Sequence, residues 1–538
     1  MKKIFLFAFA LIASTAMQAQ LQEYSAVELR NATDAGTSTI NHVYSNAQGD
    51  IFFIGTAASN GENPAVWYKV DTIETAPFRV NAKKTNSNLI FGKQAAKADT
   101  PSWFGASDRG NFSSWAATAT DNGDLVMAVT FCHSDSNYLA DNKMLQMNML
   151  TNTGLLAHDE LEGAYNLVNN KIENYGALIV ATEDAWLNTN KVFRQIDGQA
   201  DGFKFVDVAT DGTNYYVLTL LNPGLVLESD TIRAAHKSGS IAVLKFNKEW
   251  QLAGYCVSEG TAGKNIGNLR YAGGKLYYSG NLTATKGGSF GMGGKTIETA
   301  NAGNGIVLAT LDTDLKCESL NLIETCAAAG KKSGAITIYD EVVDGTNAYL
   351  TGFFMGGIVV AEGDTMSAAN ATAVLIKYDL SEGKIAKATH LESTAITGAS
   401  SLIAHGDSIY MYAYDWAAEN RISLYGYDKE LNAGDTIALV KAAGKEVSNS
   451  VTWTEKGILA YSFRTDNTIT FAADESQTYT TSDGKFRAIL AQQYLFKEPE
   501  TAIDNTVLPT EKAVKYIQNG QLYIRRGEHI FNALGQQL

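Results

Sequence analysis

Residues 343–380, VDGTNAYLTGFFMGGIVVAEGDTMSAANATAVLIKYDL, contain the two-part pattern that decides the fold. The first part is a pair of aromatic or β-branched segments joined at Asp344-Gly345, and the second is the apolar alternating segment AVLIKYD. An Asp-Gly pair tolerates the positive φ that a tight hairpin turn requires, and the flanking residues favour strands. The stretch therefore predicts a strand hairpin, a long loop and a further strand.

The same pattern recurs along most of the chain, which indicates a repeat architecture. Seven copies are found, in residues 41–71, 115–150, 205–255, 268–315, 336–380, 401–431 and 450–496. Antiparallel sheets of about four short strands cannot bury both faces alone, so stacked copies are expected. We predict an all-β chain with a single seven-bladed β-propeller. A β-solenoid needs shorter and more constant periods, and two or three β-sandwiches would not repeat one pattern.

The last copy lacks an obvious fourth strand, because the chain becomes polar after Phe496 and meets Pro499. The segment YSAVEL, at Tyr24–Leu29, has the alternation of a strand and lies near the predicted start of the mature chain. We expect it to complete the seventh blade and close the ring.

Composition agrees with many short strands joined by glycine turns. The 538 residues are 45% hydrophobic and include 48 Gly, 25 Tyr and only 6 Pro, which excludes bulk disorder. The formal net charge of −14 disfavours an unspecific affinity for nucleic acid or anionic lipid.

The N-terminus has the features of a secretory signal peptide. Lys2 and Lys3 precede an apolar core at residues 4–13, and the small residue Ala19 precedes Gln20. We expect residues 1–19 to be removed and the mature protein to be extracellular or on the outer cell surface, with the periplasm as the alternative. No later run is long and apolar enough to predict a transmembrane segment.

The chain has four cysteines, and export would permit a disulfide. Cys317 and Cys326 are nine residues apart, a spacing that allows a bridge between neighbouring strands. Buried free thiols are the alternative.

No motif predicts a cofactor or a catalytic centre. The seven histidines are scattered without metal-ligand spacing, and the TDNGD stretch at residues 120–124 is better interpreted as a hairpin turn than as part of a calcium loop. Aromatic residues at predicted loop positions could form a platform for a sugar or a peptide, although such residues often cover loop bases instead. These candidate ligand-binding residues are Trp103, Trp186, Tyr414 and Trp416.

The connections between second and third strands are long, whereas the first hairpin turns are short. The long ones include Asn222–Ser240, Thr283–Asn304, Met355–Thr372 and Thr465–Lys485. In a four-stranded blade they emerge on one face, and long loops on a rigid scaffold are a usual place for binding. We expect the ligand on that face.

Two parts of the chain resemble known families. The phrase DGTNAYLTGFF followed by AVLIKYD, with its relatives between Asn41 and Lys497, resembles secreted propeller-repeat proteins of the Bacteroidetes. The tail, ETAIDNT at residues 500–506 and then residues 512–538, resembles a short type IX secretion sorting domain. The resemblance implies contact with an outer-membrane export machinery. It divides the chain into a propeller at residues 20–497, a linker at 498–511 and a small hairpin-like tail at 512–538.

A regular scaffold with one elaborated face, an export signal and no catalytic motif favours a non-enzymatic binding or adhesion module. Its partner would be an extracellular protein or glycan. The alternative is a propeller enzyme acting on an extracellular glycan or peptide, with acidic residues from several blades at the central channel.

Overall fold

The computed structural model contains two compact units, residues 21–495 and residues 1–20 with 496–538. The residues that it describes are 24–31, 37–58, 65–70, 73–74, 78–79, 87–94, 102–107, 111–132, 145–151, 154–161, 167–168, 171–172, 174–182, 187–196, 202–237, 239–284, 287–300, 303–326, 334–361, 364–473, 478–480, 487–494, 514–518, 521–526 and 529–532. The predicted signal peptide and the linker at 498–511 lie outside these residues.

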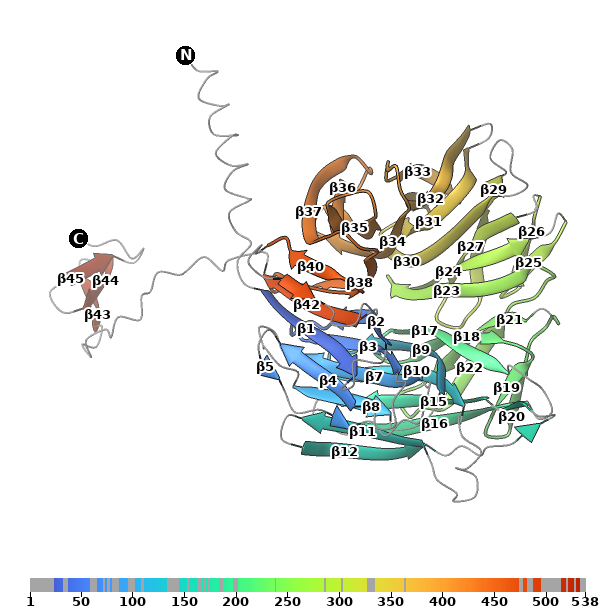
Figure 1. The fold of residues 1–538 in the computed structure, drawn as a ribbon, viewed down its shortest axis with the longest axis horizontal. Coiled ribbons are helices and arrows are strands. Elements are labelled where there is room, and N and C mark those ends of the chain that lie inside the picture. The colour runs from blue at the N-terminus through green and yellow to red at the C-terminus, as the bar shows by residue number, and fades with distance from the viewer. Residues whose placement is uncertain are drawn as a thin grey trace, which may run out of the picture. The chain divides into compact units, whose positions relative to one another are not determined.

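The larger unit is a seven-bladed β-propeller of antiparallel sheets, which confirms the predicted fold class (Figure 1). Blade 1 consists of β2 (Thr37–Ser45), β3 (Ile51–Ala58), β7 (Ser87–Gln94) and β8 (Trp103–Ser107). Blade 2 consists of β9 (Asn111–Ala119), β10 (Leu125–Cys132), β15 (Asn174–Ala181) and β16 (Leu187–Gln195). Blade 3 consists of β17 (Phe203–Thr210), β18 (Tyr215–Leu221), β21 (Ser240–Phe246) and β22 (Leu252–Val257). Blade 4 consists of β23 (Gly263–Ala272), β24 (Lys275–Ala284), β27 (Gly303–Leu311) and β28 (Cys317–Ile323). Blade 5 consists of β30 (Ala335–Asp344), β31 (Asn347–Ala361), β32 (Asp364–Asp379) and β33 (Lys384–His390). Blade 6 consists of β34 (Thr397–His405), β35 (Ser408–Asp415), β36 (Asn420–Asp428) and β37 (Ala433–Ala442). Blade 7 consists of β38 (Val447–Trp453), β39 (Ile458–Thr465), β42 (Arg487–Tyr494) and β1 (Tyr24–Asn31).

The ring is closed by pairing the two ends of the propeller chain. β1 pairs antiparallel with β42 from Tyr24 opposite Gln493 to Leu29 opposite Ala488. The first strand of the chain is thus the outermost strand of blade 7.

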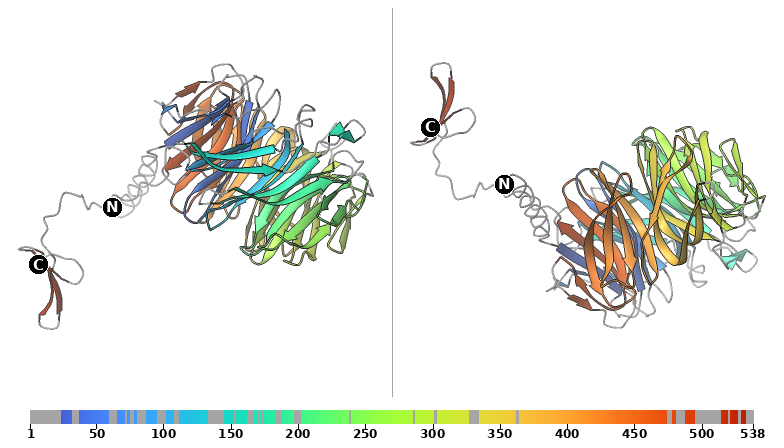
Figure 2. Two further views of the ribbon diagram at one scale, coloured as in Figure 1. Left: turned by 90° about the horizontal axis from the view of Figure 1, so that it is seen from below. Right: turned by 90° about the horizontal axis from the view of Figure 1, so that it is seen from above.

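The core lies between the blades, whose sheets pack face to face (Figure 2). Strand β21 illustrates why its sequence, SIAVLKF, is almost continuously apolar. Ile241 and Val243 pack toward blade 4, whereas Ala242 and Leu244 pack toward blade 2, so both faces are buried.

The tight turns between first and second strands form where Asn-Gly and Asp-Gly pairs predict them. Gly123, Gly212 and Gly345 have φ values of 88°, 81° and 61°, a region that glycine adopts without steric cost. These turns lie on the face opposite the long connections.

The long second-to-third connections fold into hairpins, and most of them join the preceding blade. β4 (Ala65–Val70), β11 (Leu145–Thr151), β19 (Gly224–Leu227) and β40 (Thr468–Phe471) pair with the outermost strands β1, β8, β16 and β37. In blade 4, Gly291 of the hairpin β25 (Ser289–Met292) and β26 (Lys295–Glu298) forms a bridge with Glu259, just beyond β22. In blade 5, β31 continues past the sheet and pairs with β29 (Thr325–Cys326), just beyond β28. These connections therefore fasten neighbouring blades, a role that was not predicted for them.

The proposed Cys317–Cys326 bridge is wrong. Both thiols are free, because the two residues lie at opposite ends of one extended segment instead of on paired strands. At about 3.3 Å per residue, nine residues separate their Cα atoms by roughly 25 to 30 Å, whereas a disulfide needs less than about 7 Å.

In the smaller unit, the C-terminal segment forms a three-stranded antiparallel sheet of β43 (Val514–Gln518), β44 (Gln521–Arg526) and β45 (His529–Asn532). Among the described residues, no helix has the length and apolar character needed to cross a membrane.

Candidate functional site

The innermost strand of every blade carries a β-bulge at about the same height. In β30, for example, Ile338 pairs with Gly352 and Asp340 with Thr351, which leaves Tyr339 as the extra residue. Six of these extra residues line the central cavity, and together we call them the bulge ring: Asn41, Ser113, Val206, Tyr339, Ser400 and Asn449. The innermost strand of blade 4 has its bulge between Lys264 and Gly267.

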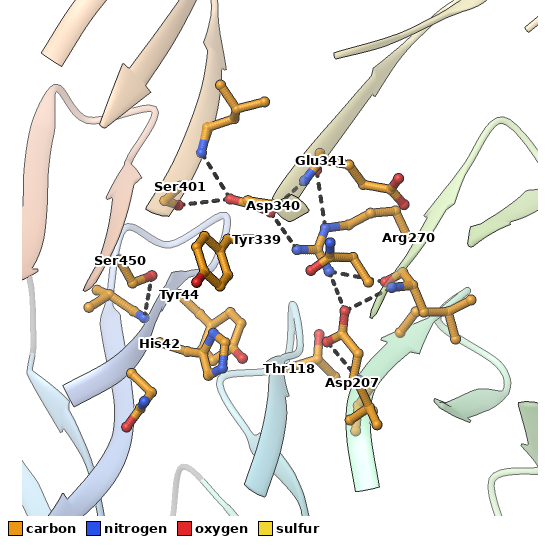
Figure 3. Close-up of a pocket in the computed structure, with 18 of the residues that line it drawn as sticks. His42, Tyr44, Thr118, Asp207, Arg270, Tyr339, Asp340, Glu341, Ser401 and Ser450 are labelled. Carbon is orange, nitrogen blue, oxygen red and sulfur yellow. Dashed lines mark hydrogen bonds and ion pairs between the residues drawn. The ribbon is translucent and has the colours of Figure 1, made fainter. Parts of the chain in front are cut away.

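The cavity at the axis of the propeller has a volume of about 1420 Å³ and is lined by all seven innermost strands. Its most prominent side chain is Tyr339, which is 43% exposed and lies between Asp340 and the His42–Tyr44 pair (Figure 3). Burial lowers the pKa of His42 and raises the pKa of Tyr44, so both side chains are neutral near pH 7. The bulge ring itself contains no charged residue.

In blades 3, 5 and 7 the residue after the bulge has a different role, because it bonds to the next blade. Ser450 Oγ accepts a hydrogen bond from the backbone N–H of Val43 at 3.0 Å. Asp207 and Asp340 do the same for the N–H groups of Leu269 and Leu402, at 2.8 and 2.9 Å. These bonds satisfy backbone donors of innermost strands, which pair with a neighbouring strand on one side only.

Arg270 joins the two aspartates across three blades. Its two terminal nitrogens each lie 2.7 Å from a carboxylate oxygen, one of Asp207 and one of Asp340 (Figure 3). Burial opposes the charge of Arg270, but the two carboxylates outweigh burial and raise its pKa. The Asp340 carboxylate also accepts bonds from the Ser401 hydroxyl and its neighbouring N–H groups. Both aspartates are therefore fully engaged in holding blades together.

Glu341, next to Asp340 on β30, is 1% exposed. Burial raises its pKa to about 8, although a hydrogen bond to Ser279 and the charge of Arg270 act in the opposite direction. Its Oε1 atom has no hydrogen-bond partner. Glu341 is among the residues that line the cavity, and because its carboxyl group is buried it influences stability.

The four aromatic residues predicted to bind a ligand are not brought together. Tyr414 lines the cavity, and Trp416 stacks against it with ring centroids 5.5 Å apart. Trp416 Nε1 donates to the Glu446 carbonyl at 3.0 Å, so its polar end is occupied. Trp103 is 2% exposed and packs between Phe52 and Phe91 in the core, which excludes contact with a ligand. Trp186 lies outside the described residues.

The described part of the chain contains no group of three or more His, Cys, Asp and Glu side chains that could hold a metal ion. Besides neutral groups, the lining residues of the cavity include Lys204, Asp121, Asp211 and Arg464. Asn41 Oδ1 and Asn449 Nδ2 are buried atoms without a hydrogen-bond partner, one an acceptor and the other a donor. They lie in blades 1 and 7, which are neighbours across the closure of the ring.

The sequence contains a signal for the bulge ring, although none of the predictions used it. Polar doublets interrupt the apolar alternation in the first strand of several copies, as in Asn41-His42, Ser113-Ser114, Ser400-Ser401 and Asn449-Ser450. The first member of each doublet is the extra residue of a bulge and lines the cavity, and in Asn449-Ser450 the second member bonds to the next blade.

No family model matches this chain, and no curated protein matches its sequence. Similar solved structures include the Dos1 propeller, with 10% identity, a TM-score of 0.39, and coverage of 87% of this chain and 95% of that one. The polysaccharide lyase Uly1 has 10% identity and a TM-score of 0.39 over 88% and 100% of the two chains. The β-propeller domain of the trilobed protease from Pyrococcus furiosus has 8% identity and a TM-score of 0.39 over 83% and 96%. These likenesses carry no argument about what this chain binds.

Proposed function

We propose that this protein is an exported, non-enzymatic binding module that takes an uncharged ligand at the bulge ring of its central channel. The ligand enters from the face that carries the second-to-third hairpins. Export rests on the N-terminal segment and on the C-terminal tail described above.

The observation that carries this proposal is a difference between polar groups in the channel: some already have hydrogen-bond or ion-pair partners within the protein, and others have none. The carboxylates of Asp207 and Asp340 are occupied by Arg270 and by backbone N–H groups. The unoccupied polar atoms of lining residues include Asn449 Nδ2 and Asn41 Oδ1, together with Ser114 Oγ and Glu341 Oε1. Such groups recognise hydroxyls or amides, and the exposed ring of Tyr339 adds an apolar surface for stacking.

The same observation weighs against the enzyme alternative. Hydrolysis by paired carboxyl groups requires one of them to donate a proton and the other to attack or to activate water. Carboxylates whose oxygens already accept several hydrogen bonds, and which are needed to hold the blades, are poorly suited to either task.

The test is a binding screen of the full chain on arrays of glycans and extracellular-matrix proteins, followed by chromatographic analysis of every bound polymer. We expect saturable binding without product, at least a tenfold loss of affinity in Tyr339→Ala and in Asn449→Ala, and no loss in Tyr255→Ala. Tyr255 is a matched control because it is 52% exposed on β22, an outermost strand. Product formation from any polymer, or binding that all three variants retain, would overturn the proposal.

A further inference from the structure

The cavity extends from the bulge ring to both faces of the propeller. At the face that carries the second-to-third hairpins, it is lined by Lys204, the second residue of β17, and by Val447, the first residue of β38. At the opposite face, which we call the turn face, it is lined by Asn122 and Gly212 in the tight turns of blades 2 and 3. Lys204, Asn122 and Gly212 are all exposed. The lining of the cavity therefore reaches solvent at both ends.

Short side chains line part of the cavity between the bulge ring and the turn face. On blades 2 to 5, the half-buried lining residues near this face include Thr118, Ala119, Thr210, Ala272 and Val343. None of these five is charged or aromatic. The Asp211 carboxylate at this end accepts hydrogen bonds within its own turn, from the N–H groups of Thr213 and Asn214. The cavity thus continues past the ring to the turns of blades 2 and 3.

The dimensions of the cavity suit one extended polymer chain. Blade 3 lines it continuously from Lys204 to Gly212. At about 3.3 Å per residue, and with one residue taken up by the bulge, this segment spans roughly 20 to 25 Å. A volume of about 1420 Å³ over that length gives a mean cross-section of roughly 60 Å². An extended chain in stacked sheets occupies about 5 by 10 Å, so there is room for one such chain and not for a folded domain.

A carbohydrate chain suits this passage better than a peptide does. A peptide that adds to a sheet needs a regular row of free backbone groups along an edge. The β-bulges interrupt that row in every innermost strand, and several N–H groups of these strands already bond to a neighbouring blade. Hydroxyl groups both donate and accept, so a neutral sugar can bond to Asn41 Oδ1 and to Asn449 Nδ2. Its flat face can pack on the exposed ring of Tyr339.

Building on the proposed function, we propose that the channel is a passage open at both faces and that its ligand is a linear, neutral polysaccharide that threads the propeller. The bulge ring lies between the two openings, so it binds internal units of the chain instead of a chain end. Entry requires a free, unbranched end. A chain whose two ends both carry groups wider than the channel can therefore neither enter nor leave.

The experiment uses the full protein and linear cello-, xylo-, manno- and malto-oligosaccharides that are longer than the passage and carry biotin at both ends. Monovalent streptavidin binds biotin almost irreversibly, and it is far wider than the channel. When streptavidin is added after the oligosaccharide has bound, we expect dissociation upon dilution, followed by size-exclusion chromatography, to slow at least a hundredfold. When it is added before the protein, binding should weaken at least a hundredfold. An oligosaccharide with biotin at one end only should bind and dissociate normally with streptavidin attached.

Thr118→Trp tests the path to the turn face, because it places a large side chain beyond the bulge ring. It should abolish trapping by streptavidin added after binding, since the chain can no longer emerge at that face. Thr346→Trp is the matched control, because Thr346 is exposed in the turn of blade 5 and does not line the cavity. It should trap the chain as the wild type does. Circular dichroism checks that both variants are folded, and the capping of the wild type is decisive without them.

The outcomes separate this inference from the proposed function. Dissociation that streptavidin added after binding does not slow would overturn the passage and leave the bulge ring as the site of a ligand that enters from one face. Binding of a peptide from the matrix array that is sensitive to Tyr339→Ala, without binding of any neutral oligosaccharide, would overturn the polysaccharide and retain the proposed function. Absence of binding to all of these oligosaccharides and to both arrays would overturn both.

Discussion

In blades 5 and 7 the bulge-ring residue and the residue that follows it are one position apart along the innermost strand, yet they have different roles. Asn449 and Tyr339 face the channel, whereas Ser450 and Asp340 bond to the next blade. The charged groups belong to the second set, where they stabilise the ring. The first set is neutral and has unoccupied hydrogen-bonding atoms. The difference teaches that Asp207, Arg270 and Asp340 hold neighbouring blades together, so that under the proposed function recognition depends on amides, hydroxyls and aromatic faces.

The strongest way to break this comparison is Arg270→Met. Removing the guanidinium leaves the carboxylates of Asp207 and Asp340 close together with little solvent, at side-chain exposures of 12% and 14%. We expect the free energy of unfolding to fall by about 3 kcal/mol, near the low end for a broken buried pair because Arg270 is itself partly exposed. Urea denaturation followed by tryptophan fluorescence measures this change.

Arg233→Met is the matched control, because Arg233 is exposed on β20 (Asp230–Arg233). It should change stability by less than about 0.5 kcal/mol. Equal stability of the two variants would mean that Arg270 is not structural, and the channel carboxylates would again be candidates for catalysis.

The fold was predictable because each blade repeats a hairpin turn and an apolar strand. Asp344-Gly345 marks the turn, and a strand such as β21 must be apolar on both faces because blades pack on each side. The hairpins of the long connections were not predicted. Their strands are short, as in Gly224–Leu227 and Asp230–Arg233, and their partners lie in another blade. Sequence periodicity does not reveal a pairing of that kind.

The site was predictable only in part. Tyr414 lies on the channel, but Trp103 is buried although it was assigned to a loop. A tryptophan that follows Pro101 and Ser102 has the local sequence of a loop residue, and only the tertiary packing of β8 places it in the core. The role of Arg270 could not be deduced either, because its two partners are 63 and 70 residues away in the sequence.

A second test concerns pH, and it uses Glu341. Burial raises the pKa of this carboxyl group to about 8, well above the value near 4.3 of a solvated glutamate. The folded state therefore keeps the proton between about pH 5 and pH 8, whereas the unfolded state releases it. Stability must fall as pH rises through this window, by at most about 1.4 kcal/mol per pH unit from this group.

Glu341→Gln should remove this dependence, because a neutral amide resembles the protonated acid. We expect the variant to match the wild type near pH 5 and to exceed it near pH 8 when urea unfolding is measured across the window. The exposed Glu392 provides a control, since Glu392→Gln should follow the wild-type curve. If the free energies of unfolding of wild type and Glu341→Gln changed with pH in the same way, the raised pKa assigned to Glu341 would be contradicted.

Ser450→Ala tests a single bond between blades. It leaves the buried N–H of Val43 without its acceptor, and an unsatisfied buried donor of this kind costs about 1 kcal/mol or somewhat more. Thermal unfolding should show the loss. Ser113→Ala makes the same chemical change at an exposed position of the bulge ring, and we expect its melting temperature to equal that of the wild type. If both variants lost the same amount of stability, the bulge ring could not be distinguished from the residues that bond to the next blade.

Asn449→Ala gives the smallest effect on stability and the sharpest contrast, because Asn449 directly precedes Ser450. Its Nδ2 atom is a buried donor without a partner, and such a group destabilises the free protein. We therefore expect the free energy of unfolding to stay the same or to rise by up to about 0.5 kcal/mol, while ligand binding falls. Asn41→Ala should behave alike, because the Asn41 Oδ1 atom lacks a donor. If either alanine variant loses more than about 1 kcal/mol, these amides support the fold in the way that Ser450 does, and the bulge ring is not reserved for a ligand.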